Sequence, residues 1–136
     1  MDNCKFCQIA DKKAPAKIIY ENENVICFLP KEVEVYGHTL IVPKKHYTDL
    51  YDIPSDVLCE LAKIAQKLTL EYKQKINATG MNLMHASGKD GQQSVFHFHF
   101  HFHLLPRFKD DGLNTWPNLA KIEVDTNELW DKLRTG

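Results

Sequence analysis

Residues 94–107 read SVFHFHFHFHLLPR, so four histidines recur at every second position and each follows a phenylalanine. Such alternation is typical of a β-strand, because successive side chains of a strand point to opposite faces of the sheet. The pattern predicts a strand from Val95 to Leu105 with one phenylalanine face and one histidine face. We expect the phenylalanine face to lie in the core. Burying four imidazoles against apolar neighbours would leave donors and acceptors unpaired at about 1–3 kcal/mol each.

The histidine face has three possible uses on the residues alone. It could be a solvated surface, although four histidines in register are many for that role. It could bind a metal by itself, but histidines two apart on a strand are ~6.6 Å apart and the row from His97 to His103 spans ~20 Å, so one ion joins at most a neighbouring pair. It could also line a catalytic cleft, where one neutral imidazole attacks and its neighbours bind charge.

The rest of the chain predicts a single domain over residues 1–136. Apolar residues at helical spacing predict one long helix within residues 53–75, with Ser55 as its N-cap. Short apolar runs bounded by turn residues predict further strands, two of them in residues 17–30, one in 38–46 and one in 81–86. A short amphipathic helix is expected at residues 126–134.

Charge and targeting signals narrow the class of ligand and the compartment. Seventeen basic and eighteen acidic side chains give no broad cationic field, which favours small ligands over nucleic acid. The N-terminus lacks the pattern of a secretion signal, and no window approaches the ~18 apolar residues of a transmembrane helix. We therefore expect a cytoplasmic protein without a membrane partner. Thiols stay reduced in the cytosol, which favours metal ligands or core positions over disulfides for Cys4, Cys7, Cys27 and Cys59.

Three segments together resemble one known family. The run from Gln93 to His101 (QSVFHFHFH) is similar to the signature of the histidine-triad (HIT) family of nucleotide hydrolases and transferases, in which three histidines alternate with apolar residues. Residues 37–46, GHTLIVPKKH, resemble the second hallmark of that family. Cys4 and Cys7 match the Cys-x-x-Cys of its zinc-binding bacterial members.

The resemblance implies an α+β fold, with a five-stranded antiparallel sheet, one long helix and one short helix, paired as a homodimer. The implied activity is hydrolysis of a purine nucleotide or nucleotide conjugate, of the adenosine phosphoramidate, nucleotidyl or dinucleoside polyphosphate type. The middle imidazole of the triad attacks the α-phosphorus, and water hydrolyses the nucleotidyl-histidine that results. A different class of function shares the same fold and ligand, namely a non-catalytic, zinc-stabilised scaffold that binds nucleotides or a partner protein.

By resemblance, His99 is the nucleophile and His101 is the catalytic histidine beside it. Residues expected to contact the substrate are His38, Gln93, Ser94 and His103. A structural zinc ion is expected on two thiolates and two imidazoles, a closed tetrahedral set, from Cys4, Cys7, His46 and His97. Because the nucleophile must be neutral, activity is expected to fall on the acid side near pH ~6–7.

The fourth histidine leaves the register of the triad open. Counting forward from Gln93 makes the triad His97, His99 and His101. Counting back from Arg107 makes it His99, His101 and His103, with His101 attacking. A shift of two residues keeps every side chain on its face, so alternation cannot decide. The forward count is favoured here because the first triad histidine is also a zinc ligand in zinc-binding relatives, and the spacing from Cys7 through His46 to His97 looks uninterrupted.

Other departures from the family pattern concern the substrate. Pro30 stands where many members carry an acidic residue that hydrogen-bonds the ribose, so that contact is in doubt. His85 stands in the segment before Gly88 where the family often has asparagine. Substrate preference is expected to differ accordingly.

Overall fold

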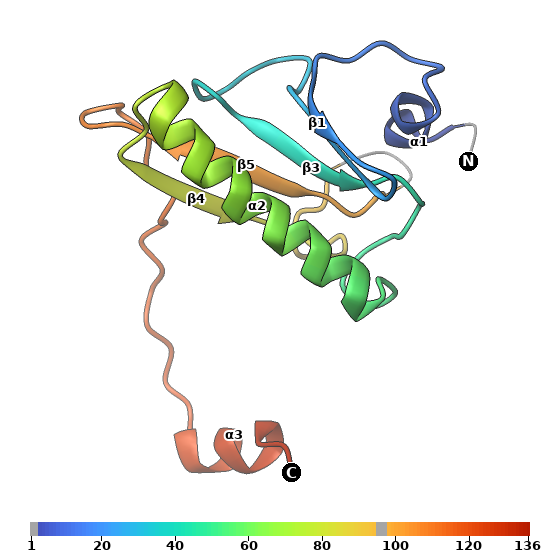
Figure 1. The fold of residues 1–136 in the computed structure, drawn as a ribbon. Coiled ribbons are helices and arrows are strands. Elements are labelled where there is room, and N and C mark those ends of the chain that lie inside the picture. Colours follow the sequence, from blue (N-terminus) through green and yellow to red (C-terminus); the bar gives the residue numbers. More distant parts are fainter. Residues whose placement is uncertain (1–2, 95–97) are drawn as a thin grey trace.

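The computed structural model describes residues 3–94 and 98–136, and its centre is a five-stranded antiparallel sheet (Figure 1). In spatial order the strands are β1 (Ile18–Glu21), β2 (Val25–Phe28), β3 (Thr39–Pro43), β5 (Phe102–Arg107) and β4 (Gly80–Met84). The helices in the described residues are α1 (Lys5–Ala10), α2 (Ser55–Lys75) and α3 (Thr126–Leu133). The expected α+β fold is confirmed, with one short helix more than expected.

Helix α2 covers one face of the sheet (Figure 1). Its apolar stripe is buried as the spacing predicts, and Leu61 and Leu68 are almost fully inaccessible, which stabilises the fold by about 1.5–3 kcal/mol for each side chain. The predicted N-cap is wrong by one residue. Pro54 occupies the N-cap with extended backbone and no side-chain hydrogen bond, and Ser55 is the first helical residue.

Helix α1 lies over the opposite face. Consecutive residues of a strand point to opposite faces, and β2 divides in this way. Val25 and Cys27 belong to the core beneath α2, whereas Ile26 and Phe28 pack with residues of α1. All residues of β2 and β3 are buried, so the centre of the sheet is covered on both sides.

The strand predicted from Val95 is shorter than expected. Residues 95–97 lie outside the described part of the chain, residues 98–101 are not in a ladder, and β5 begins at Phe102. Pairing with both neighbouring strands ends at this level, since β4 stops at Met84, paired with His103, and the ladder between β3 and β5 ends at the pair of Ile41 and Phe102. The segment before β5 still directs a phenylalanine towards the core, since Phe100 lies in the core beneath α2.

The C-terminal arm, residues 112–136, leaves the body of the domain and ends in α3 (Figure 1). The helix predicted at 126–134 is confirmed, but none of its residues is buried. The arm exposes many large apolar side chains, namely Leu113, Trp116, Leu119, Ile122, Val124, Leu129, Trp130 and Leu133. Short helices in proteins are normally stabilised by packing of their apolar face against the rest of the fold, and α3 lacks such packing within the described part of this chain.

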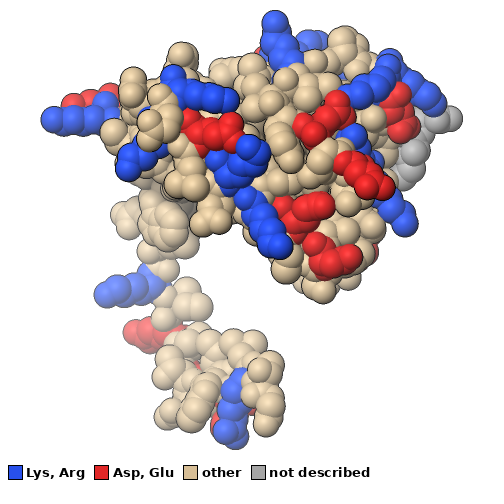
Figure 2. Space-filling model, viewed as in Figure 1, with Lys and Arg blue, Asp and Glu red and all other residues tan. Residues whose placement is uncertain are grey.

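The surface carries charges of both signs. Figure 2 shows basic and acidic side chains interspersed over the face that it draws, without a broad basic area on that face. None of the described helices is long and apolar enough to cross a membrane.

Candidate functional site

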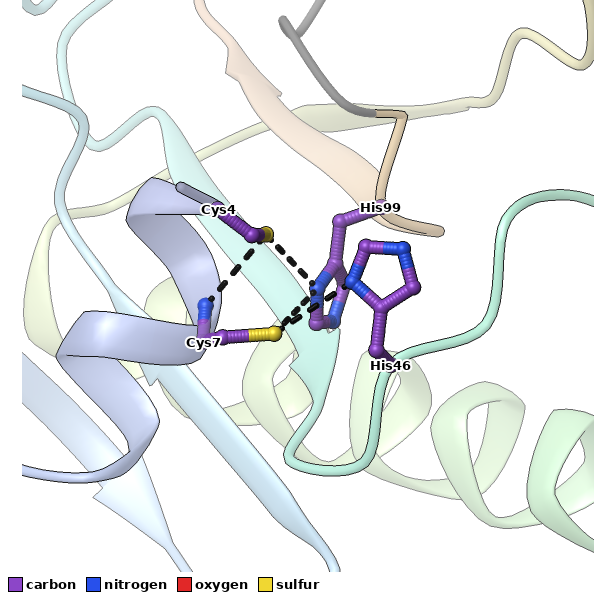
Figure 3. A group of neighbouring side chains, drawn as sticks. All are labelled: Cys4, Cys7, His46 and His99. Atoms are coloured by element: carbon purple, nitrogen blue, oxygen red, sulfur yellow. Dashed lines mark hydrogen bonds between the residues drawn. The ribbon is translucent and has the colours of Figure 1, made fainter. Parts of the chain in front are cut away.

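Two thiols and two imidazoles converge beside α1 (Figure 3). Cys4 is the N-cap of α1 and Cys7 lies in its first turn, His46 follows β3, and His99 precedes β5. The Nδ1 atom of His99 lies 3.3 Å from Sγ of Cys4 and 3.6 Å from Sγ of Cys7, and Nδ1 of His46 lies 3.3 Å from Sγ of Cys7. All four donor atoms lie within 4.8 Å of one another.

This donor set fits a zinc ion. Tetrahedral zinc at ~2.3 Å from sulfur and ~2.0–2.1 Å from nitrogen separates neighbouring ligand atoms by about 3.3–3.8 Å, close to the distances found here. The Nε2 atom of His99 donates to the carbonyl of Pro43 at 2.9 Å, which orients the ring and leaves Nδ1 for the metal. Burial raises the pKa of the Cys7 thiol, so a metal ion would supply the charge that stabilises its thiolate.

The fourth member of this cluster is His99, the residue to which the forward count gave the nucleophilic role. His97, the fourth zinc ligand on that count, lies outside the described residues. His99 is completely buried and both of its ring nitrogens are engaged, one by the thiol sulfurs and one by a carbonyl. The lone pair on Nδ1 of His99 lies against the two thiol sulfurs of a metal-binding cluster and not against another histidine of the row, so this geometry favours the backward count.

Three other histidines form a chain beside this cluster. Nδ1 of His101 lies 2.8 Å from the carbonyl oxygen of His99. Nε2 of His101 lies 3.1 Å from Nε2 of His103, and Nδ1 of His103 lies 3.0 Å from Nε2 of His38. His103 thus lies between His38 and His101. Among the described histidines of this row, His99 and His101 are buried and His103 is partly buried, and their ring nitrogens pair with one another, with carbonyl groups and with thiols.

The carbonyl oxygen of His99 fixes which atom donates in each hydrogen bond between these three histidines. The carbonyl of His99 can only accept, so Nδ1 of His101 carries the hydrogen and the lone pair on its Nε2 accepts from His103. In neutral rings, His103 then donates from Nε2 and accepts at Nδ1 from Nε2 of His38. Nδ1 of His38 is left as an acceptor, and it is the one buried side-chain nitrogen or oxygen without a partner among the described residues.

Burial keeps these rings neutral. It lowers the pKa of His38 and His101, and it lowers the pKa of His103 and His99 to about 4. For His99, His101 and His103, neighbouring imidazoles lower the pKa further, since a positive charge on one ring disfavours a second. The lone pair on Nε2 of His101 is therefore available at neutral pH.

A cavity of about 790 Å³ lies next to the histidine chain. Phe6 connects the two, because it lines the cavity and its ring meets that of His101 edge to face at 5.1 Å. The described residues that line it are mostly apolar and include Pro30 and three lysines, and none of them is acidic. The contribution of α1 to this cavity was missed by sequence reasoning, because six residues are too few to show helical periodicity.

Gln93 and Ser94 lie in the loop before the histidine row, and their contact with phosphate stays a prediction. The amide of Gln93 is buried; its Nε2 donates to the carbonyl of Thr48 at 2.7 Å, and its Oε1 accepts from the backbone of Gly88 at 2.9 Å. Gln93 therefore holds the loop before the histidine row in place. Ser94 is exposed and immediately precedes the residues outside the described part.

Comparisons with known proteins find relatives that belong to one family. The HIT domain family matches residues 11–110. An uncharacterized HIT-like protein of Methanocaldococcus jannaschii is 41% identical over 109 residues, which cover 80% of this chain and 82% of that protein. A zinc-bound histidine triad family protein of Mycobacterium smegmatis is similar in structure, with a TM-score of 0.79 and 34% identity over 88% of this chain and 85% of that one. A HIT family hydrolase of Legionella pneumophila has a TM-score of 0.71 and 31% identity, covering 85% and 98% of the two chains.

Proposed function

Because the chain belongs to the HIT family, we propose that it hydrolyses nucleotide substrates of the adenosine phosphoramidate, nucleotidyl or dinucleoside polyphosphate type through a covalent nucleotidyl-histidine. The nucleophile in this proposal is His101. One observation carries it: Nδ1 of His101 is held by the carbonyl of His99, so Nε2 presents a lone pair beside two further neutral imidazoles. The adjoining cavity supplies apolar surface for a purine base.

In the first step with adenosine phosphoramidate, the lone pair on Nε2 of His101 attacks the α-phosphorus of the substrate. A nitrogen–phosphorus bond forms, and the bond from phosphorus to the leaving amine breaks. The carbonyl of His99 accepts from Nδ1 and stabilises the positive charge that develops on the ring. The leaving amine takes a proton from His103. A bound phosphate places negative charge beside His103 and raises its pKa, so His103 becomes protonated when the substrate binds.

In the second step, water attacks the same phosphorus. The proton of the water returns to His103, the bond from phosphorus to Nε2 of His101 breaks, and the nucleoside monophosphate leaves. His38 is placed to orient His103, since its Nε2 donates to Nδ1 of His103 at 3.0 Å when His103 is neutral. The unpaired Nδ1 of His38 is a further acceptor that a substrate hydroxyl or water can satisfy.

The zinc ion is proposed as a structural cofactor on Cys4, Cys7, His46 and His99. Its role would be to fix α1 against the sheet and to hold His99, whose carbonyl orients the nucleophile. Support comes from the donor set and from the zinc-bound relative of Mycobacterium smegmatis. Reduced thiols at the metal agree with the proposed cytoplasmic location.

A homodimer is part of the proposal. Helix α3, at the end of the apolar arm of residues 112–136, has no buried residue. The edge strand β4 exposes Leu83 and Met84. A second copy of the chain would cover such surfaces, which seldom remain exposed on a monomer.

Intact-protein mass measured after brief exposure to adenosine phosphoramidate tests the nucleophile. The quench must be alkaline, because nitrogen–phosphorus bonds hydrolyse in acid. We expect the mass of one nucleotidyl group on the wild-type chain and none on His101→Asn. His97→Asn is the matched control: it should keep both zinc and adduct, whereas the forward register requires it to lose zinc. An adduct on His101→Asn would refute the assignment, and tight nucleotide binding without turnover would support the scaffold alternative.

A further inference from the structure

His85 joins the proposed nucleophile to the loop at the end of β4. Its Nδ1 lies 3.0 Å from the backbone carbonyl oxygen of His101, and its Nε2 lies 2.5 Å from Oγ of Ser87. We propose that His85 is a positioning residue, which sets the place of the His101 ring by holding the peptide that carries it. This inference rests on the function proposed above, because it concerns the same nucleophile.

The need for such a contact follows from where the ladder between β4 and β5 ends. The last pair in this ladder joins Met84 and His103, and β5 itself begins at Phe102. The peptide of His101 therefore lies beyond the regular pairing on the β4 side, where a backbone N–H would otherwise serve its carbonyl. The side chain of His85, the first residue after β4, supplies that donor.

Both ends of the link fix its direction. The carbonyl of His101 can only accept, so Nδ1 of His85 carries a hydrogen and, in the neutral ring, Nε2 is an acceptor. At the other end, the backbone N–H of Leu50 donates to Oγ of Ser87 at 3.0 Å. The hydroxyl of Ser87 is then free to donate to Nε2 of His85. The N–H of Leu50, the hydroxyl of Ser87, the ring of His85 and the carbonyl of His101 can therefore all be hydrogen-bonded at the same time.

The ring of His85 is held from the side as well. It stacks on the ring of Phe100 at 4.2 Å between centroids, tilted by 25°, and meets Phe102 edge to face at 5.8 Å. These aromatic residues flank His101 in the sequence. The loop that carries Ser87 is anchored in turn by Gln93. The peptide of His101 is therefore fixed to two neighbouring segments through a single side chain.

Small displacements of this peptide affect the reaction directly. The ring of His101 is pinned by Nδ1 to the carbonyl of His99, and its Nε2 faces Nε2 of His103 at 3.1 Å. A shift of the peptide moves Nε2 relative to both His103 and a bound phosphorus. Misplacement of a reacting group by 1 Å can reduce the rate by about 10²-fold.

Isosteric substitutions separate the two ends of the link. His85→Asn places an amide nitrogen near the position of Nδ1, where it can still donate to the carbonyl of His101. His85→Gln places its amide near the position of Nε2, where it reaches Ser87 but not that carbonyl. His85→Phe keeps a ring for stacking and loses both contacts. We expect kcat for adenosine phosphoramidate to fall by about 10–100-fold in the Gln and Phe variants, with KM nearly unchanged, and to be largely restored in the Asn variant.

A purely structural role for His85 predicts a different pattern. The Phe variant would then keep the wild-type kcat, or Asn and Gln would lose activity equally, and either result would overturn the inference. Thermal unfolding of each variant shows whether it is folded. Ser87→Ala, which removes only the far contact, is a second variant in case the Phe variant does not fold. Ser87→Ala should also lower kcat, but by a smaller factor than His85→Gln or His85→Phe.

A measurement without turnover separates this inference from the proposed reaction. In ¹⁵N-histidine NMR spectra of the zinc-loaded wild type at neutral pH, His85 and His101 should both be protonated at Nδ1. The His101 nitrogen signals should shift in His85→Gln but return towards the wild-type values in His85→Asn. If these signals appear and no nucleotide substrate is turned over, the link is correct and the proposed function is wrong. A His85 ring protonated at Nε2 alone would overturn the link itself.

Discussion

The Nε2 atom of His101 lies 3.1 Å from the Nε2 atom of His103. Two identical ring nitrogens at this distance share one hydrogen, and the bond from Nδ1 of His101 to the carbonyl of His99 assigns it to His103. One histidine thus presents a lone pair and its neighbour presents a proton donor. This is the pairing that nucleophilic attack and leaving-group protonation require.

The first prediction tests His103 as the acid through the leaving group. His103→Asn should slow hydrolysis of adenosine phosphoramidate by about 10²–10⁴-fold, because the amine then leaves without a proton donor. A nucleotide ester with a nitrophenolate leaving group needs little protonation, so the same variant should lose far less activity on it. Rates of both substrates with wild-type and variant protein give the comparison. Equal losses on the two substrates would show that His103 does not act as the acid.

The second prediction concerns the acid limb of kcat/KM. Burial lowers the pKa of His101, and it lowers the pKa of His103 to about 4. A lowered pKa means that the neutral ring persists to lower pH than in a free imidazole. The acid limb should therefore lie below the ~6.5 of a free imidazole, towards the lower end of the range of ~6–7 expected from the sequence or beneath it. Circular dichroism and zinc content at each pH separate titration from unfolding or metal loss. An acid limb at or above ~6.5 in folded, zinc-loaded protein would contradict this assignment.

The third prediction concerns the metal. Protein purified without a metal column should hold about one zinc ion per chain, and Cys7→Ser should lose most of it and unfold at a lower temperature. Acid should also release zinc, because protons compete for thiolate and imidazole ligands. Cys59→Ser is the matched control, since Cys59 is an exposed thiol outside the cluster. Metal-free wild type that unfolds at the same temperature as zinc-loaded protein would contradict a structural ion.

Much of the fold could be predicted because its patterns are local. The apolar runs of β2 and β3 and the helical spacing of α2 each lie within one segment, and each forms the expected element. The roles within the histidine row are different. Moving the triad by two residues changes no side chain's face, so the sequence period cannot distinguish His99 from His101. The choice depends on tertiary distances, above all the 3.3 Å from Cys4 to His99.

The contacts of His85 and of α1 escaped prediction for the same reason. His85 reaches a backbone carbonyl on a neighbouring segment, and a carbonyl leaves no signal in the sequence. Phe6 lies in a helix of six residues, and its contacts with the rings of His99 and His101 cross most of the chain. Such pairings are fixed by packing of the complete sheet and are not encoded by any one segment.

The last prediction tests the C-terminal arm as the site of homodimer contact. The arm is anchored to the body as far as Thr115, because Arg107 bonds to the carbonyl of Leu113 and to Oγ1 of Thr115, which also donates to Asn82. Beyond that point the large apolar side chains are exposed, with Trp116 82% and Trp130 62% accessible. A chain that ends after Thr115 keeps the anchor and removes this surface. We expect the full chain to be a dimer at micromolar concentration and the shortened chain to be mainly monomeric.

The unfolding temperature of the shortened chain at low concentration should stay close to that of the full chain, since α3 buries no residue in the body. The matched variant is Leu83→Lys, which places a charge on the exposed edge strand β4 and leaves the arm intact. If Leu83→Lys dissociates the dimer and removal of the arm does not, the copies pair through the sheet edge and the arm has another partner. Light scattering of the three proteins over a range of concentrations distinguishes these outcomes, and a monomeric full chain would contradict the homodimer.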